Sequence, residues 1–584
     1  MSTFTVEKDG FLLDGKEIKL VSGAMHYFRI VPEYWESRMR KLRELGCNCL
    51  ETYVCWNLHE PREGTFDFSG RLDLGKYISM AESLGLYVIV RPGPYICSEW
   101  DLGGLPWWLL RYDMALRSSD PLYLEKCAPY LERVCAVLRP HLIGNGGGVV
   151  LVQVENEYGS FGNDKAYLHW LRDFYRSHGI GCGLITSDGE TDFLLGNGTA
   201  EGVTASVNYR NESERCIAML KKFRAGQPGA VMELWNGRAQ HWGEPFVRRD
   251  VAEVADSVEK ALDNAALVNL YMFHGGTNFG FMNGSLYQNG KFTVQATSYD
   301  VDAPLNEYGQ KTPKYYAEQK VICGKRGKPI VNETEEPVLR IPGALRYEGE
   351  TPLAACGEEL FSVRETTVPK SMEQCGQGYG YIVYETEAYV GEAGAELLLP
   401  AVHDAAHVYA DGEYLATVFR DEEQKQKIFL KGPRRVKIGI LVENLGRINF
   451  GKELYDRKGL LGDLVLHDCG YQANSKCFGF RTYCFDLETL PSVYNGHARE
   501  NCPAFYRYTF DCAAPCDALL RLEGFTRGAV LLNGSNLGRH WKTEGSENKL
   551  YIPAPLMRRG ANELVVFDVL HTPGKKRLWF GGAE

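Results

Sequence analysis

The chain lacks the usual sequence features of a protein that binds nucleic acid, spans a membrane or holds a metal. Its formal net charge is -10 over 584 residues, and no basic stripe offsets this. That balance argues against nucleic acid or an anionic membrane surface as partner. No apolar run approaches membrane-spanning length and no basic-then-apolar leader opens the chain, so we expect a cytoplasmic protein. No His-Glu-x-x-His or similar spacing occurs, so we expect no metal and no cofactor.

Cysteine is present without the spacing of a redox or zinc motif. The 17 cysteines are an odd number, are irregularly spaced and include no Cys-x-x-Cys pair. We therefore expect reduced thiols packed as small apolar groups, as in cytoplasmic proteins. Aromatic residues make up 12% of the chain. They either fill the core or form stacking platforms for a flat, weakly polar ligand such as a sugar.

The first 325 residues alternate between apolar strand patterns and helical periods. The eight strand candidates span 19–27, 48–56, 86–95, 149–158, 183–189, 203–209, 230–237 and 268–276. Eight such repeats predict a (β/α)8 TIM barrel over residues 1–325. The alternative is a doubly wound open sheet, which would need a Gly-rich phosphate turn after an early strand, and the sequence has none.

The helical segments between the strands have apolar stripes and recognisable ends. In residues 32–46, Pro32 suits the first helical turn and Gly46 the position just after the helix. The apolar stripe there consists of Trp35, Met39, Leu42 and Leu45. The further helical periods cover 71–85, 121–138, 165–179, 214–226 and 250–266.

From about residue 326 the helical periods give way to short alternating runs separated by Gly, Pro, Asn and Asp. Asp411-Gly412 and Asn533-Gly534 are hairpin-turn dipeptides flanked by strand patterns. We predict two β-sandwich or jelly-roll domains, 326–475 and 476–584. These domains either support the barrel or bind carbohydrate, and they offer a surface for a homodimer.

Polar clusters end six of the eight predicted strands, where a parallel barrel carries its chemistry. They are His26-Tyr27, Tyr53 to Asn57, Arg91 to Tyr95, Asn156-Glu157-Tyr158, Asn208-Tyr209 and Glu233 to Asn236. The fourth strand shows the change most clearly, because the buried run from Val149 turns polar and ends in Glu157-Tyr158-Gly159. With a period of two, Gln153, Glu155 and Glu157 share one face. Glu157 lies nearest the rim, whereas Glu155 is deeper and suits a supporting role or a pair with an arginine.

Glu157 and Glu233 form a plausible pair of reacting carboxyl groups. Glycosidic bond cleavage needs one carboxyl group that stays protonated and one that stays ionised, on opposite sides of the anomeric carbon. The ends of the fourth and seventh strands could supply them. A rim carboxylate in a salt bridge is the alternative for Glu157. Other candidates are Glu51, Glu60, Glu99 and Asp188, each of which could equally hold sugar hydroxyls or lock a loop.

Seven long motifs, in order along the chain, resemble those of glycoside hydrolase family 35, the barrel-type β-galactosidases. They are SGAMHYFR (22–29), ETYVCWNLHEP (51–61), RPGPYICSEWDLGGLPWWL (91–109), QVENEYGS (153–160), MELWNG (232–237), YMFHGGTNFGFMNG (271–284) and TSYDVDAPLNEYG (297–309). The later β segments match as well. The chain is most similar to leaderless bacterial members, which act on terminal β-linked galactose and often favour β-1,3 links. The implied substrate is a β-galactoside oligosaccharide.

The resemblance also implies a role for each matching residue. Glu157 would be the acid/base and Glu233 the nucleophile of a retaining exo-β-galactosidase, with their carboxyl groups roughly 5 Å apart. Asn156 would hydrogen-bond the sugar 2-hydroxyl, and Tyr299 would lie beside the nucleophile. Trp235 would form part of the wall for the leaving sugar. The galactose pocket would consist of Tyr53, Cys97, Ser98 and Glu99, with Glu99 taking ring hydroxyls.

Three positions depart from the family pattern. Ser98 replaces the usual Ala, Arg238 replaces the Trp that often follows the nucleophile motif, and Val301 replaces a Tyr. Arg238 suggests an acidic or unusual leaving group, or else is a surface residue paired with Glu244. Ser98 and Arg238 leave open a related exo-glycosidase for another sugar such as a β-glucosaminide. A second alternative is a non-catalytic galactoside-binding protein built on the same scaffold.

Overall fold

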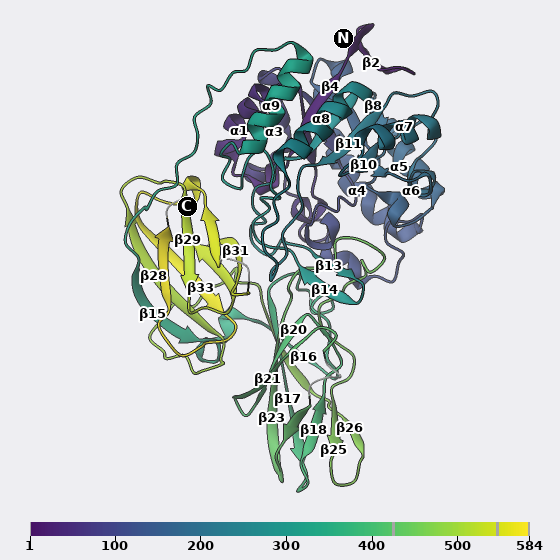
Figure 1. Ribbon diagram of the computed structural model, residues 1–584. Helices are drawn as coiled ribbons and strands as arrows, with labels where there is room; N and C mark the ends of the chain where they lie inside the picture. The colour runs from purple at the N-terminus through teal and green to yellow at the C-terminus, as the bar shows by residue number, and fades with distance from the viewer. Residues whose placement is uncertain (1, 423–426, 545–547, 582–584) are drawn as a thin grey trace.

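The computed structural model describes residues 2–422, 427–544 and 548–581 as a barrel with two β domains beside it (Figure 1). The barrel forms the upper part of the view. One β domain lies below it and contains β16 (Ser362–Thr366) to β26 (Asn474–Lys476). The other lies to the left and contains β15 (Arg346–Pro352), β28 (Ala504–Cys512) and β33 (Gly560–Asp568). The (β/α)8 barrel followed by β-sandwich domains, predicted from the alternating patterns, is confirmed.

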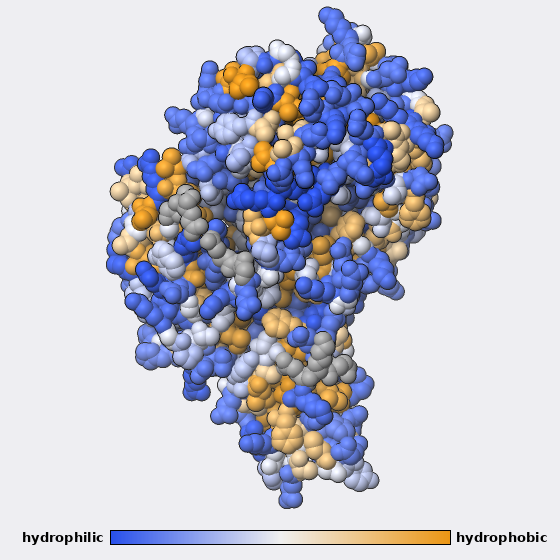
Figure 2. Space-filling view, viewed as in Figure 1, coloured by the Kyte–Doolittle hydropathy of each residue, from blue (hydrophilic) through white to orange (hydrophobic). Residues whose placement is uncertain are grey.

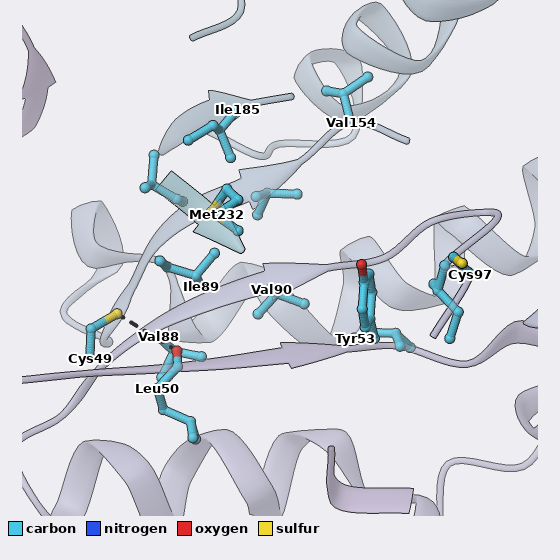
Figure 3. Packing of buried hydrophobic residues seen from close by; sticks show 14 of the residues in the cluster. Cys49, Leu50, Tyr53, Val88, Ile89, Val90, Cys97, Val154, Ile185 and Met232 are labelled. Carbon is cyan, nitrogen blue, oxygen red and sulfur yellow. Dashed lines mark hydrogen bonds between the residues drawn. The ribbon is translucent and has the colours of Figure 1, made fainter. Parts of the chain in front are cut away.

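Parallel strands form the wall of the barrel, and most of their residues are buried, as expected for strands covered on both faces. In chain order the strands are β4 (Leu20–Met25), β5 (Cys49–Tyr53), β6 (Tyr87–Arg91), β7 (Val149–Gln153), β8 (Gly183–Ile185), β9 (Asp188–Gly189), β10 (Val207–Tyr209), β11 (Ala230–Trp235) and β12 (Leu267–His274). Figure 3 shows core side chains from this region, including Val88, Ile89 and Val90 of β6 and Met232 of β11.

The barrel closes through one irregular stretch of chain. The strand order runs β8-β7-β6-β5-β4-β12-β11-β10-β9, so it begins and ends on residues 183–189. Between β8 and β9, the Thr186 amide donates to the Thr204 carbonyl at 2.8 Å, and the Ser206 amide donates to the Thr186 carbonyl at 3.1 Å. The predicted fifth strand is therefore split into β8 and β9, and both halves border the segment that leads into β10.

Helices cover the outside of the barrel, as the periodic segments predict. They are α1 (Pro32–Glu44), α3 (Leu74–Ser83), α4 (Pro121–Leu138), α5 (Lys165–Ser177), α6 (Asp192–Gly198), α7 (Ser213–Phe223), α8 (Val251–Asn264) and α9 (Pro313–Arg326), together with the single turn α2 (Trp56–His59). In α1 the predicted ends and stripe are confirmed. Pro32 opens the helix, Gly46 follows Leu45 with a φ of 103°, and Trp35, Met39 and Leu42 are buried.

The first β domain packs two main antiparallel sheets and the short strand pair β19 (Ala401–His403) and β24 (Gly459–Leu461) around an apolar core. The larger has the order β16 (Ser362–Thr366), β27 (Phe480–Phe485), β17 (Tyr381–Val390), β23 (Arg434–Glu443), β20 (Ala405–Ala410) and β21 (Glu413–Phe419). The smaller has the order β22 (Ile428–Leu430), β18 (Ala395–Leu398), β25 (Val465–Asp468) and β26 (Asn474–Lys476). Asp411-Gly412 makes the turn between β20 and β21, as its composition predicts.

The second β domain is also a two-sheet sandwich. Its larger sheet has the order β15 (Arg346–Pro352), β28 (Ala504–Cys512), β33 (Gly560–Asp568), β30 (Arg527–Leu532) and β31 (Ser535–Trp541). The smaller consists of β32 (Lys549–Ile552), β29 (Ala518–Glu523) and β34 (Arg577–Gly581). Two strands lie across the boundary drawn at 475/476, since β15 pairs with β28 and β27 pairs with β16 and β17.

Apolar and charged contacts join the three parts. An aromatic cluster combines Phe281 of the barrel with Tyr381 and Phe485 of the first β domain and Phe505 and Phe567 of the second. The face seen in Figure 2 is mostly hydrophilic, with scattered apolar residues. Among the described residues, no helix combines the length and apolarity needed to cross a bilayer.

Candidate active site

All nine site residues predicted from the sequence line a single pocket of about 370 Å³. These residues are Tyr53, Cys97, Ser98, Glu99, Asn156, Glu157, Glu233, Trp235 and Tyr299. Tyr53 is the last residue of β5, Glu157 follows β7, and Glu233 lies near the end of β11. The pocket therefore opens where the parallel strands end, as the polar strand ends predict.

Glu233 accepts three hydrogen bonds from three different strands. The Tyr53 hydroxyl and the Arg91 guanidinium donate to Oε1 at 3.0 and 2.6 Å, and the Trp235 indole N–H donates to Oε2 at 2.9 Å. Arg91 is fully buried and forms an ion pair with Glu233. A carboxylate with this set of donors is held in one orientation.

Glu157 has a very different environment, although it shares the pocket with Glu233. Asn208 Nδ2 donates to Glu157 Oε1 at 3.1 Å. Burial, followed by the nearby negative charge of Glu233, raises the pKa of Glu157 to about 8. Its backbone is left-handed, with a φ of 46°, a conformation that non-glycine residues adopt mainly where the surroundings impose it. Glu157 is therefore a carboxyl group that keeps its proton near neutral pH.

Asn156 is oriented by the same arginine as Glu233. Its Oδ1 accepts from Arg91 Nη2 at 2.6 Å and from Gln153 Nε2 at 3.1 Å. Its Nδ2 has only a long contact of 3.5 Å to the Ile96 carbonyl. The amide oxygen is thus occupied, and the amide N–H groups are left to face the pocket.

Glu155 lies beneath the pocket in a buried ion pair, as predicted for the deeper carboxylate of this strand. Arg117 binds it with two hydrogen bonds, Nε to Oε1 at 2.9 Å and Nη2 to Oε2 at 2.8 Å. The Tyr167 hydroxyl also donates to Oε1, at 3.1 Å. Both charged side chains are about 1% exposed. The pair holds the turn that carries Asn156 and Glu157.

Cys97, Ser98 and Glu99 form an unusual turn in the pocket wall. All three have left-handed backbones, with φ values of 55°, 56° and 48°, and Figure 3 shows Cys97 on this loop. Tyr299 donates its hydroxyl hydrogen to Glu99. The sequence placed Tyr299 beside Glu233, but the tyrosine that donates to Glu233 is Tyr53. Tyr299 therefore orients Glu99 through this hydrogen bond, and it lines the same pocket as Glu233.

The Ser98 hydroxyl, a departure from the family pattern, has a partner within the protein. Arg29 Nη1 donates to Ser98 Oγ at 2.6 Å, and Nη2 donates to the Ser98 carbonyl. The guanidinium also lies 3.8 Å from the centre of the Tyr299 ring. Arg29 thus contacts both Ser98, which precedes Glu99, and Tyr299, which donates to Glu99.

Comparison with known proteins identifies the family. The model of glycosyl hydrolases family 35 matches residues 10–324, and models of the first all-β domain and the galactose-binding domain of β-galactosidase match 369–477 and 503–562. A β-galactosidase of Xanthomonas manihotis is 39% identical over 561 residues, covering 94% of this chain and 91% of its own. The human β-galactosidase-1-like protein 2 is 37% identical, with coverages of 96% and 88%.

The chain belongs to glycosyl hydrolases family 35. It is a glycoside hydrolase of the β-galactosidase type, and its substrates are β-galactosides. The family assignment agrees with the seven motifs found in the sequence.

This family 35 enzyme draws part of its pocket wall from outside the barrel proper. Leu286 and Gln288 come from the hairpin of β13 (Ser285–Gln288) and β14 (Lys291–Val294), and Asn449 and Phe450 come from the first β domain. Asn449 Nδ2 donates to Cys97 Sγ at 3.6 Å, and its carbonyl accepts from the Tyr95 hydroxyl at 2.5 Å. No sequence signal marked these residues, because their place depends on how the domains pack.

A buried ion pair fixes this loop of the first β domain against the barrel. Arg447 donates its backbone N–H to Asp101 Oδ1 at 2.7 Å and its guanidinium to Glu373 Oε1 at 2.5 Å. Arg447, Asp101 and Glu373 are all fully buried. Removing one partner of such a group leaves a buried charge uncompensated, so the geometry of the loop is tightly specified.

Three of the four other carboxyl candidates from the sequence, Glu51, Glu60 and Asp188, do not line the pocket. Glu51 lies behind it, 3.8 Å from Arg91, and burial raises the pKa of Glu51 to about 7. Glu60 accepts from the Trp56 indole and the Gly64 amide, both at 2.7 Å. Asp188 accepts from the Gly159 amide at 2.9 Å. These three carboxyl groups bind backbone amides and side chains around the pocket, whereas Glu99 lines the pocket itself.

One group in the described part of the chain has the composition of a metal site: His403, Asp404 and Asp456 of the first β domain. Its carboxylates already have cationic partners. Lys458 Nζ lies 2.7 Å from Asp404 and 2.8 Å from Asp456, and Arg420 lies 2.8 Å from Asp456. The buried Lys458 and the partly buried Arg420 compensate the two buried carboxylates, so this is an ion-pair network within the domain.

Proposed function

We propose that this β-galactosidase is an exo-acting, retaining enzyme in which Glu157 is the acid/base and Glu233 the nucleophile. The observation that carries the proposal is the difference between two carboxyl groups in one pocket. Glu233 accepts hydrogen bonds from Tyr53, Arg91 and Trp235 and pairs with the buried Arg91 cation. Glu157 has a pKa raised to about 8 by burial and by Glu233. Two carboxyl groups with environments this different suit an acid and a nucleophile.

The proposed reaction is a double displacement. In the first step Glu233 attacks the anomeric carbon, the glycosidic C–O bond breaks, and Glu157 gives its proton to the leaving oxygen. Losing that proton leaves Glu157 ionised. In the second step Glu157 takes a proton from water, and the resulting hydroxide displaces Glu233 from the galactosyl-enzyme, which restores both groups.

Several residues are proposed to hold galactose in position for this attack. Asn156 Nδ2 would donate to the 2-hydroxyl, since its amide oxygen is already occupied. Glu99 would accept from ring hydroxyls, steadied by Tyr299. Tyr53, Cys97 and Ser98 would form the remaining wall, with Trp235 on the side of the leaving sugar. Hydrogen bonds that strengthen in the transition state contribute directly to catalysis.

The decisive experiment combines two variants with product stereochemistry. Glu233→Gln should abolish turnover of galactosyl disaccharides, whereas Glu157→Gln should retain turnover of aryl galactosides with good leaving groups, which need no proton. Proton NMR of the first product should show β-galactose. Disaccharide turnover by Glu233→Gln, or α-galactose as the first product, would contradict the assignment.

Sugar and linkage specificity need a separate test. We propose a preference for terminal β-1,3-linked galactose, on the resemblance to the leaderless bacterial members. Hydrolysis of matched β-1,3, β-1,4 and β-1,6 galactosyl disaccharides would measure it, and equal kcat/KM values would contradict it. A parallel panel of aryl glycosides that includes the β-glucosaminide tests the sugar itself.

A cytoplasmic location and a homodimer remain proposals. All 17 cysteines are free and most are buried, as suits a reducing compartment. Cell fractionation would test the location, and light scattering on the purified protein would give the oligomeric state.

A further inference from the structure

Two arginines line the outer part of the pocket, away from its buried carboxyl groups. Arg210 follows β10 and is exposed, and the Arg238 side chain, in the loop after β11, is 46% exposed. By contrast, Glu233 is only 5% exposed. The pocket thus has negative groups at its base and positive groups at its rim.

Arg210 has no hydrogen-bond or ion-pair partner in the described part of the chain. Among residues 2–422, 427–544 and 548–581, none forms a hydrogen bond or an ion pair with it. The buried arginines around the pocket are different, since Arg91 and Arg117 each bind a carboxylate. An unpaired guanidinium on a pocket wall is available to a ligand.

Arg238 has a partner that a ligand could replace. Its Nη2 lies 3.1 Å from Glu244 Oε2, and the same oxygen lies 3.3 Å from His241 Nδ1. The pair is exposed to solvent, and exposed ion pairs of this kind contribute little to stability. The surface pairing expected as an alternative for Arg238 is therefore present, and it does not prevent the side chain from facing the pocket.

The rim arginines lie close to the residues that hold the two reacting carboxyl groups. Arg210 comes two residues after Asn208, which donates to Glu157. Arg238 comes three residues after Trp235, which donates to Glu233. Because Glu157 is proposed to protonate the leaving oxygen, the leaving group lies on its side of the pocket, and Arg210 and Arg238 line the same pocket. Guanidinium groups bind carboxylate and sulfate oxygens through paired hydrogen bonds.

We infer that the leaving-group side of the pocket binds an anionic substituent through Arg210 and Arg238. The substituent is a carboxylate, as in a uronic acid, or a sulfate ester on the sugar released with it. The inference rests on the proposed function, because it needs Glu157 on the leaving-group side.

The test compares substrates that differ only in charge. One arm uses galactosyl-glucuronic acid and its neutral amide, and the other uses galactosyl-N-acetylglucosamine with and without a 6-sulfate. In at least one arm, kcat/KM should be about tenfold higher for the anionic member, which corresponds to roughly 1.4 kcal/mol. The arm that shows the preference identifies the substituent. A ratio of one or less in both arms would overturn the inference.

Variants assign the preference to these residues. Arg210→Gln and Arg238→Gln should each lower the anionic-to-neutral ratio, and the double variant should bring it close to one. Arg248→Gln is the matched control, since Arg248 is a 71% exposed arginine of the same loop that does not line the pocket. An unchanged ratio in the double variant, or an equal loss in the control, would contradict the assignment.

A binding measurement tests the anion site independently of the proposed catalytic mechanism. Calorimetric titration of Glu233→Gln with each substrate pair measures the charge preference without turnover, and the preference should weaken as salt is added. If Glu233→Gln still cleaves disaccharides, the catalytic assignment fails, and the substrate ratios still test the rim arginines. Equal affinities within both pairs would refute the anion site alone.

Discussion

Arg91 donates a 2.6 Å hydrogen bond to Glu233 from a strand on the other side of the barrel mouth. The same Nη2 atom lies 2.6 Å from Asn156 Oδ1. One buried guanidinium therefore sets the position of the proposed nucleophile relative to the residue proposed to hold the sugar 2-hydroxyl. Its cation also lies 4.0 Å from the centre of the Tyr53 ring, whose hydroxyl donates to Glu233 as well.

Replacing Arg91 should impair catalysis even when its charge is kept. Lysine is a single point charge and cannot replace a planar fork that serves two acceptors. We expect Arg91→Lys to lower kcat/KM on an aryl galactoside by about 10²-fold, as small displacements of reacting groups do. Circular dichroism would show that the variant is folded. Wild-type kinetics in Arg91→Lys would show that the shared contact has no catalytic role.

The pH dependence of kcat/KM should report the proton on Glu157. With its pKa raised to about 8, Glu157 is protonated at neutral pH, and activity should fall as the pH rises through about 8. Asn208 donates to Glu157 and stabilises its ionised form. Asn208→Ala should therefore move this alkaline fall in kcat/KM to higher pH. An alkaline fall that stays at the same pH, or moves to lower pH, would contradict the assignment of this titration to Glu157.

The buried pair of Arg117 and Glu155 should be necessary for stability. Arg117→Met leaves Glu155 buried without its cation, and breaking such a pair costs about 3–5 kcal/mol. Arg40→Ala is the control, because the pair of Arg40 and Glu36 is about half exposed and should contribute at most about 1 kcal/mol. Denaturant unfolding would compare the two. Equal losses would show that burial of the Arg117 pair is of no consequence.

Glu318 should make the barrel less stable as the pH rises. It lies buried on α9 with both carboxyl oxygens lacking a hydrogen-bond partner among the described residues, and burial raises its pKa to about 8. Its pKa in the unfolded chain is about 4.3. Between these values only the native state binds the proton, so the free energy of unfolding falls as the pH rises from about 4.3 to about 8.

Glu318→Gln should remove this pH dependence. The variant should unfold at a higher temperature than the wild type at pH 8.5, with a smaller difference at pH 5, in calorimetry of the barrel transition. The exposed Glu335→Gln is the control and should behave like the wild type. A Glu318→Gln effect that is the same at both pH values would refute the explanation.

Local patterns were sufficient for much of the barrel and for the strand ends. A buried strand needs only a short apolar run, and a helix needs only its stripe and ends. The helix predicted over 32–46 was therefore identified within two residues, and the strand predicted over 149–158 begins at Val149 but ends already at Gln153. The period of two predicted for Gln153, Glu155 and Glu157 is wrong, because the strand ends at Gln153 and both glutamates have left-handed backbones. Glu155 nevertheless forms the predicted pair with an arginine. The family motifs then selected nine residues that the structure brings into one pocket.

Partner choice depends on contacts between distant parts of the chain, and there the sequence was insufficient. Tyr53 rather than Tyr299 donates to Glu233. The sequence places Arg91 at the end of a predicted strand but predicts no contact between it and Glu233. β15 leaves the first β domain to pair with β28, more than 150 residues away, because strand pairing depends on which edge is free. No periodicity encodes such choices.

The sequence by itself determined the alternation of strands and helices, the polar strand ends and, through its motifs, the family. Only the tertiary structure decided the electrostatics of the pocket. The pKa of Glu157 depends on its burial and on Glu233 from another strand, and the pocket wall is completed by Asn449 and Phe450 from a different domain. The physical reason is the distance along the chain over which each effect acts. Periodicity and turn chemistry act over a few residues, whereas desolvation, ion pairing and pocket shape arise only when distant segments are packed together.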